Sequence, residues 1–112
     1  MFHIKEKRLA PDCQGIFVGG ELDMSVAPEL RDAIERAHEQ QVKCMVIELS
    51  EATFIDSTSI GVLVGAHRRL EAAGGSLAIV CANRNVRQTF EIAGLDRLIH
   101  IDERLEEPAP AA

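Results

Sequence analysis

The spacing of apolar residues along the chain predicts short strands that alternate with helices. Five stretches carry the alternating or continuous apolar pattern of β-strands, at residues 4–9, 15–22, 44–49, 76–81 and 98–101. The first is charged and only loosely alternating, which indicates an edge strand, and the turn at Pro11-Asp12 favours a hairpin with the second. Residues 44–49 are almost continuously apolar, so we expect burial on both faces, as in a parallel sheet.

Apolar residues recur at helical spacing in three segments between these strands. Ser25 is expected to cap the first helix, with Pro28 in its first turn, where proline is tolerated. The second helix follows residues 56–59 and ends at Gly74-Gly75, and Asn83 is expected to cap the third. The resulting order, ββαβαβαβ, predicts one α/β domain with a mixed, mostly parallel sheet and amphipathic helices.

The length of the chain fits one domain, and its composition limits the classes of partner that the domain can bind. We expect the domain to span residues 1–104 of the 112, and residues 105–112, with two prolines and terminal alanines, to form a disordered acidic tail. The formal net charge is −6, and the sequence carries no basic stripe of the kind that a nucleic-acid binder needs. We therefore expect no nucleic-acid partner.

The cysteines and the hydropathy indicate in which cellular compartment the protein is found. Cys13, Cys44 and Cys81 stand far apart without zinc-ligand spacing, and Cys44 and Cys81 lie in apolar runs that are typical of small core residues. The chain shows no signal peptide and no apolar stretch as long as a membrane span. We expect a reduced, cytoplasmic protein without direct membrane insertion.

The sharpest chemical feature is Asp56-Ser57-Thr58-Ser59, where three hydroxyls and a carboxylate meet at the expected start of a helix. Helix capping alone accounts for such residues, because their side chains satisfy free backbone N–H groups, but one cap needs only one of them. The alternative is phosphorylation. A helix N-terminus stabilises a phosphate, and the added charge of about −1.5 to −2 can block a partner.

A second polar cluster, Gly20-Glu21-Leu22-Asp23, ends the second predicted strand. Gly20 permits unusual backbone angles, and Glu21 and Asp23 alternate outward. By itself this pattern is typical of a solvated strand end. Functional loops gather at the carboxyl ends of parallel strands, however, so we expect the Asp23 loop and the Ser57 loop to lie side by side.

Enzyme motifs are missing around these residues. The sequence has no Gly-x-Ser-x-Gly elbow, no phosphate-binding loop and no dinucleotide fingerprint. His67 follows Ser57 by ten residues, too far to act as its base within one helix, and fits better as a satisfied, semi-buried histidine. A small hydrolase that uses Asp23, Asp56 and Ser57 is the weakest hypothesis, and we expect neither catalytic nor metal-binding residues.

Taken together, these residues resemble the STAS family, specifically its small anti-sigma factor antagonists, over about residues 2–101. Each matching fragment is weak alone, and the signal lies in their order and spacing. The fragments are Gly20-Glu-Leu-Asp23, Ile47-Glu-Leu-Ser50, Phe54-Ile-Asp-Ser-Thr58, Gly61-Val-Leu-Val64, Gly74-Gly75 and Phe90-Glu-Ile-Ala-Gly-Leu95.

The resemblance implies a partner-switching role in the control of transcription. The unphosphorylated chain would bind an anti-sigma factor that is also a serine kinase with a histidine-kinase-like ATPase fold, and a sigma factor would be released. Phosphorylation of Ser57 would dissociate the complex, and a separate serine phosphatase would restore it. ATP would belong to the kinase, so the chain itself is expected to need no cofactor and to be a monomer when free.

The expected partner surface combines the two loops and consists of Asp23, Met24, Ser25, Asp56, Ser57, Thr58 and Ser59. Met24 would be an exposed apolar contact unless it packs on the first helix. The family usually has glycine where this chain has Ser59, which leaves Thr58 and Ser59 open as alternative phosphorylation sites. STAS-like domains also serve as accessory subunits of transporters or of other signalling complexes without phosphorylation, and this alternative stays open.

Overall fold

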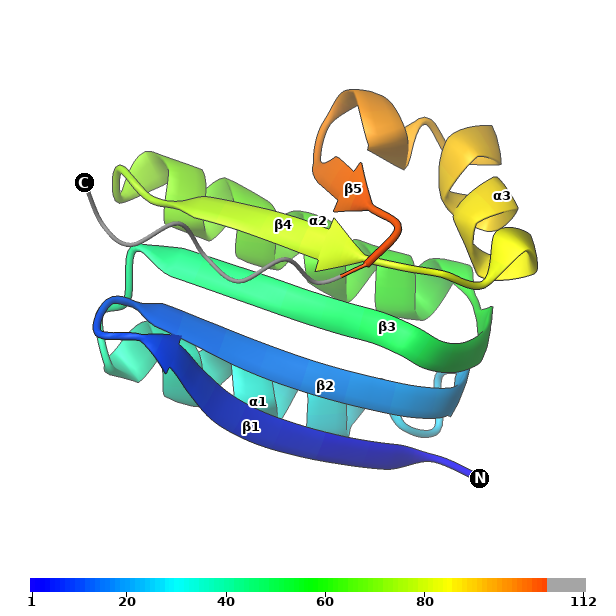
Figure 1. Ribbon diagram of the computed structural model, residues 1–112, viewed down its shortest axis with the longest axis horizontal. Helices are drawn as coiled ribbons and strands as arrows, with labels where there is room; N and C mark the ends of the chain where they lie inside the picture. Colours follow the sequence, from blue (N-terminus) through cyan, green and yellow to red (C-terminus); the bar gives the residue numbers. More distant parts are fainter. Residues whose placement is uncertain (105–112) are drawn as a thin grey trace.

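The computed structural model describes residues 1–104, which form a five-stranded sheet and three α-helices (Figure 1). The strand order is β1-β2-β3-β4-β5; β1 is antiparallel to β2, and the later neighbours are parallel. The predicted α/β class and the order ββαβαβαβ are confirmed. The elements are β1 (His3–Ala10), β2 (Cys13–Leu22), α1 (Ala27–Glu39), β3 (Cys44–Ile55), α2 (Ser57–Ala72), β4 (Ser76–Val80), α3 (Arg84–Ile92), a 3-10 helix η1 (Leu95–Arg97) and β5 (His100–Asp102).

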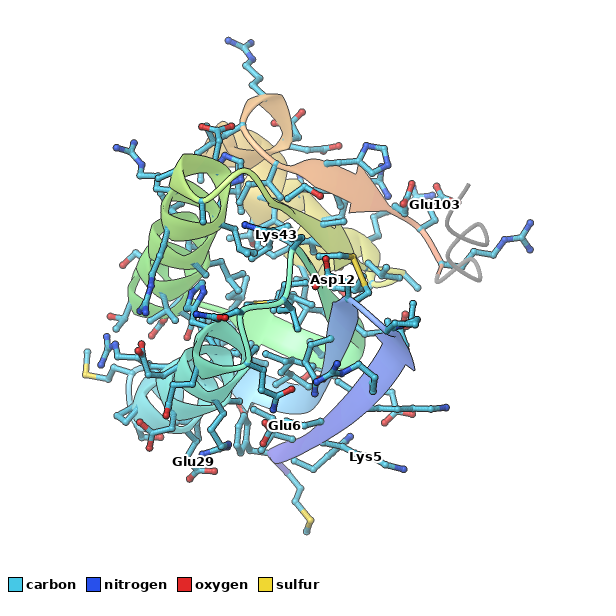
Figure 2. All side chains as sticks on the ribbon, turned by 90° about the vertical axis from the view of Figure 1, so that its left-hand side faces the viewer. Lys5, Glu6, Asp12, Glu29, Lys43 and Glu103 are labelled. Atoms are coloured by element: carbon cyan, nitrogen blue, oxygen red, sulfur yellow. A yellow bond between two sulfur atoms is a disulfide. The ribbon has the colours of Figure 1, made fainter. Side chains whose placement is uncertain are left out.

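Helices α1 and α2 cover the same face of the sheet (Figures 1 and 2). Ile16, Ile47 and Ile79 are register partners across β2, β3 and β4, and all three are fully buried in the core beneath these helices. Helix α3 and η1 extend the same core with Phe90 and Leu95. Burial of this row of isoleucines fixes the register of the parallel strands, since a slip by one residue would turn it to the opposite face.

Helix α1 begins one residue later than the sequence predicts. Its N-cap is Val26, which makes no side-chain capping bond. The prediction that Ser25 caps this helix is wrong, because the hydroxyl and the backbone N–H of Ser25 donate to the Asp23 carboxylate, at 2.5 and 2.9 Å. A capping side chain must accept from the first backbone N–H groups of the helix, and those of Val26 and Ala27 donate instead to the carbonyl oxygen of Asp23, both at 3.1 Å. Asn83 caps α3 as predicted, accepting from the backbone N–H of Val86 at 3.0 Å.

Strand β3 continues past the predicted segment 44–49 to Ile55. The extension contains polar residues, so an apolar pattern does not predict it as a strand. Neighbouring strands nevertheless pair with these polar residues. Glu51 is the register partner of Gly19 on β2, and its carboxylate lies 2.9 Å from the ring of His3 on β1. The extension matters because it carries the chain directly to Asp56 at the edge of the sheet.

Cys13 and Cys44 form a disulfide at the amino ends of β2 and β3. They are register partners with Cα atoms 4.3 Å apart, and beside them the Asp12 carboxylate accepts the backbone N–H of Lys43 at 3.0 Å (Figure 2). The expectation of three reduced cysteines is therefore wrong, because parallel pairing returns β3 to the start of β2; Cys44 is half-buried and packs against a small cluster with Val46 and Val80. Cys81 is buried and free, and burial raises the pKa of its thiol.

The last strand also begins later than predicted. Residues of the predicted strand 98–101 first complete the turn after η1, and β5 then pairs in parallel with β4. The predicted tail, 105–112, lies outside the described residues. Among residues 1–104, no helix has the length and apolar character needed to cross a membrane.

Candidate functional site

The carboxyl ends of β2 and β3 bring the two predicted loops together. Leu22 and Ile55 are register partners at these ends. The carbonyl oxygen of Leu22 accepts two hydrogen bonds from the other loop, one from the backbone N–H of Asp56 at 3.1 Å and one from the hydroxyl of Ser59 at 2.9 Å. The loop after β2 and the start of α2 therefore lie side by side, joined through a single carbonyl group.

The polar side chains at the start of α2 have different surroundings. Asp56 is the N-cap, and its carboxylate accepts the backbone N–H of Ser59 at 3.0 Å. Ser59 has no exposed area, and its hydroxyl is bonded to β2, so an enzyme cannot reach it in the folded protein. Ser57 and Thr58 are exposed. Asp56 alone thus satisfies the need for a cap, and the two remaining hydroxyls are open to a modifying enzyme.

The loop after β2 presents a charge and an apolar side chain. Hydrogen bonds from the hydroxyl and the backbone N–H of Ser25 lower the pKa of the Asp23 carboxyl, which favours its charged form. Met24 is 70% exposed, so it does not pack on α1. The backbone shortly before this loop requires a glycine at position 20. Gly20 has a φ of +87°, which suits glycine, and a Cβ atom at this position would lie 2.0 Å from the carbonyl oxygen of Met1.

Phe54 is an exposed aromatic residue that the sequence analysis did not assign to the partner surface. It is 49% exposed at the end of β3, where its register partner is Glu21 on β2. Strand alternation could have identified it, because Ile55 is buried and its neighbour must point the other way. Met24 and Phe54 give this edge of the sheet two large apolar side chains that are open to a partner.

A groove of about 420 Å³ opens between α1 and α2, beginning at Ser57 and Thr58. Burial, assisted by the positive charge of Arg69, lowers the pKa of His38 in the groove wall, which favours the neutral imidazole. We call this surface the interhelix groove; the residues that define it are Arg31, Glu35 and His38 of α1 and Ser57, Gly61, Gly65 and Arg69 of α2.

Among residues 1–104, neither Asp56 nor His67 is available as a general base for Ser57. Asp56 is committed to its capping bond, and His67 is 7% exposed on α2 with no hydrogen-bond partner for either ring nitrogen. The closest ion-pair contact of His67 is the carboxylate of Glu71, at 3.7 Å. The expectation of a satisfied, semi-buried histidine is therefore wrong, because the core closes over the ring while Glu71 stays in solvent. A base that activates Ser57 would have to come from a partner.

Within residues 1–104, no group of three or more His, Cys, Asp or Glu side chains is placed to hold a metal ion. The site thus consists of exposed hydroxyls, two exposed apolar side chains, one charged carboxylate and a neighbouring groove. Such a surface can bind a protein and can accept a covalent modification.

Comparison with known proteins places the chain in a family. A STAS-domain family model matches residues 5–107. The anti-sigma-B factor antagonist of Listeria monocytogenes is 34% identical over 98 residues, which cover 88% of this chain and 86% of the relative. The anti-sigma-B factor antagonist of Staphylococcus aureus is 32% identical over 89 residues, which cover 80% of this chain and 82% of the relative.

Solved structures share the fold. An anti-sigma factor antagonist from Mycobacterium paratuberculosis superposes with a TM-score of 0.85 at 24% identity, covering 94% of this chain and 88% of that one. The unphosphorylated antagonist SpoIIAA gives 0.78 at 24% identity, covering 91% and 90%, and the phosphorylated Bacillus SpoIIAA gives 0.68 at 23% identity, covering 91% and 93%. From the family model and the sequence relatives, this chain belongs to the STAS-domain anti-sigma factor antagonist family, whose members are generally non-enzymatic.

Proposed function

We propose that this protein is a partner-switching antagonist that binds an anti-sigma factor when Ser57 is unmodified and is released when Ser57 is phosphorylated. The observation that carries the proposal is the position of Ser57. It is an exposed serine at the first position of α2, after a capping aspartate, on the sheet edge that also presents Met24 and Phe54. Family membership supplies the class of partner.

Binding in the unmodified state would use the apolar side chains of this edge. Met24 and Phe54 are 70% and 49% exposed, and full burial of a wholly exposed side chain of this size contributes about 1.5–3 kcal/mol, so each would contribute the corresponding part against a partner. An anti-sigma factor that covers this surface would at the same time cover Ser57. Occupation of the anti-sigma factor by this chain would then release the sigma factor.

Phosphorylation would reverse the binding through charge. The kinase, which is the anti-sigma factor itself, would transfer the γ-phosphoryl group of ATP to Oγ of Ser57; the bond from the γ-phosphorus to the bridging oxygen breaks, ADP leaves, and a base of the kinase takes the hydroxyl proton. The product carries about −1.5 to −2 charges beside the carboxylate of Asp56. Burying this pair of charges in a protein interface is strongly unfavourable unless cations of the partner compensate both of them.

The other components of the cycle follow from the same proposal. A serine phosphatase would remove the phosphate and restore binding. The chain would act in the cytoplasm, without a cofactor and without catalytic activity of its own, and as a monomer when free. The alternative acceptor is Thr58, which is also exposed but does not directly follow the aspartate.

The proposal can be tested by calorimetric titration of the purified chain into the histidine-kinase-like anti-sigma factor of the source organism, in the presence of ADP. Ser57→Ala should bind like the unmodified chain, and Ser57→Asp should bind at least tenfold more weakly. Ser76→Asp is the matched control, because Ser76 is an exposed serine at the opposite end of the sheet. Equal binding by Ser57→Ala and Ser57→Asp would contradict the proposal.

A further inference from the structure

Beside helix α2 the interhelix groove is followed by a second hollow, and Arg69, which pairs with Glu35 across the two helices, lines both. The hollow of about 420 Å³ beside Ser57 and a second hollow of about 460 Å³ share His38 and Arg69 in their linings, and the second reaches Ala73 beyond the end of α2. From Ser57 to Ala73 a helix rises about 24 Å. Figure 2 shows α1 and α2 side by side on one face of the sheet, seen close to their axes.

Two glycines leave part of the groove wall on α2 without side chains. Gly61 and Gly65 are one turn apart and exposed, and a Cβ atom added at either would meet no atom within 4 Å. Glycine weakens the interior of a helix, so neither position serves the stability of α2. A wall of this kind lets another backbone come close, and Ile34 and Val62 add apolar surface to the groove.

The groove is positive in a chain whose net charge is negative. Its two hollows contain Arg31, Arg69 and Lys43 against a single carboxylate, that of Glu35. Arg69 donates to both oxygens of Glu35, at 3.0 and 2.9 Å, and Nζ of Lys43 donates to the carbonyl of Ala73 at 2.6 Å. Arg31 makes no ion pair or side-chain hydrogen bond with any residue in 1–104, and it lies at the end of the groove that contains Ser57.

We propose that the interhelix groove receives an acidic, amphipathic helix of the anti-sigma factor, which packs its apolar side against Gly61 and Gly65 and places a carboxylate beside Arg31. This inference rests on the function proposed above and adds to it the binding mode. A helix is the occupant that fits a groove between two parallel helices, where the two glycines of one wall let another backbone come close. The charge of the groove selects an acidic helix over a basic one.

The same arrangement explains how a phosphate on Ser57 acts on a partner helix. The phosphate and the partner's carboxylate would compete for Arg31, the cation that lines the same hollow as Ser57 and has no anionic partner in residues 1–104. An ion pair of phosphoserine with Arg31 removes the attraction for the partner, and its negative charge repels the acidic helix. Arg31 is thus a positioning residue of the switch, at the point where groove and phosphorylation site meet.

The test is calorimetric titration of full-length, dephosphorylated variants into the purified anti-sigma factor with ADP. Gly65→Leu fills the groove, and Arg31→Glu reverses its free charge. Each should weaken binding at least tenfold. Arg84→Glu makes the same charge reversal, and Gln88→Leu introduces the same side chain, on exposed positions of α3 outside the groove; both should stay within twofold of the unmodified chain.

Folding is checked by thermal melts, where Gly65→Leu should melt no lower than the unmodified chain, because its side chain meets no atom and leucine favours helix over glycine. Binding of Gly65→Leu and Arg31→Glu within twofold of the unmodified chain, with Ser57→Asp still weak, would overturn the groove and leave the proposed function standing. No binding by the unmodified chain would overturn the proposed function and this inference with it. A dimer of the chain alone that Gly65→Leu disrupts would make a second copy the occupant and overturn the assignment to the anti-sigma factor.

Discussion

Replacement of Ser59 by glycine, the residue that the family usually carries at this position, is expected to destabilise this protein. The Ser59 side chain has no exposed area, and its hydroxyl donates to the carbonyl of Leu22 at 2.9 Å. Loss of one such hydrogen bond costs about 1 kcal/mol, and glycine in place of serine in a helix costs about a further 0.5 kcal/mol. The cost stays near this value because the Leu22 carbonyl keeps its bond from the N–H of Asp56. A total of about 1.5 kcal/mol corresponds to a fall in Tm of about 6–12 °C for a domain of this size.

Thr58→Gly is the matched control for this measurement. Thr58 lies in the same turn of α2 but is exposed, so glycine there loses only helix propensity, about 0.5 kcal/mol or less. Scanning calorimetry and urea denaturation of both variants separate the propensity from the hydrogen bond. If Ser59→Gly and Thr58→Gly lower Tm by the same amount, the bond between α2 and the end of β2 does not stabilise the fold, and the reasoning is refuted.

Three further predictions concern stability. Under oxidising conditions the Cys13–Cys44 disulfide closes a loop of sequence separation 31, which should stabilise the folded state by about 3–4 kcal/mol. Reduction with dithiothreitol should therefore lower the urea midpoint. Equal midpoints with and without dithiothreitol, or no cross-linked peptide in non-reducing mass spectrometry, would contradict this prediction. Asp56→Ala should cost about 1 kcal/mol through loss of the cap while Asp56→Asn costs less, and equal urea midpoints of Asp56→Ala and the unmodified chain would count against the cap. Burial and the charge of Arg69 lower the pKa of His38, so the unfolded state binds more protons than the folded state. The unmodified chain should therefore lose stability relative to His38→Gln as pH falls below about 6.5. Parallel curves of unfolding free energy against pH for the two proteins would exclude this effect.

Much of the fold follows from local pattern. Apolar spacing gave the order of strands and helices, and the isoleucines of the central strands are the buried residues that the pattern indicates. Capping was predicted well where one candidate stood alone, as at Asn83, and wrongly at Ser25, where the carbonyl oxygen of Asp23 accepts from the first backbone N–H groups. A sequence pattern ranks capping residues by type and does not weigh two acceptors against each other.

Features that depend on the register of the strands could not be predicted from the sequence. Cys13 and Cys44 meet only because β2 and β3 begin in parallel register, which residue spacing does not reveal. The three hydroxyls of residues 57–59 look equivalent in the sequence, and only the packing of α2 on Leu22 buries one of them. The interhelix groove was missed for the same reason, since a glycine is informative only once α1 lies beside it.

The measurement that tests the central claim most directly is native mass spectrometry of the chain with its anti-sigma factor, before and after ATP is added, followed by peptide mapping. The account predicts a complex with ADP, then a single phosphate on Ser57 and loss of the complex with ATP, and neither change in Ser57→Ala. A phosphorylated Ser57 that stays bound, or a complex that dissociates while Ser57 remains unmodified, would contradict it.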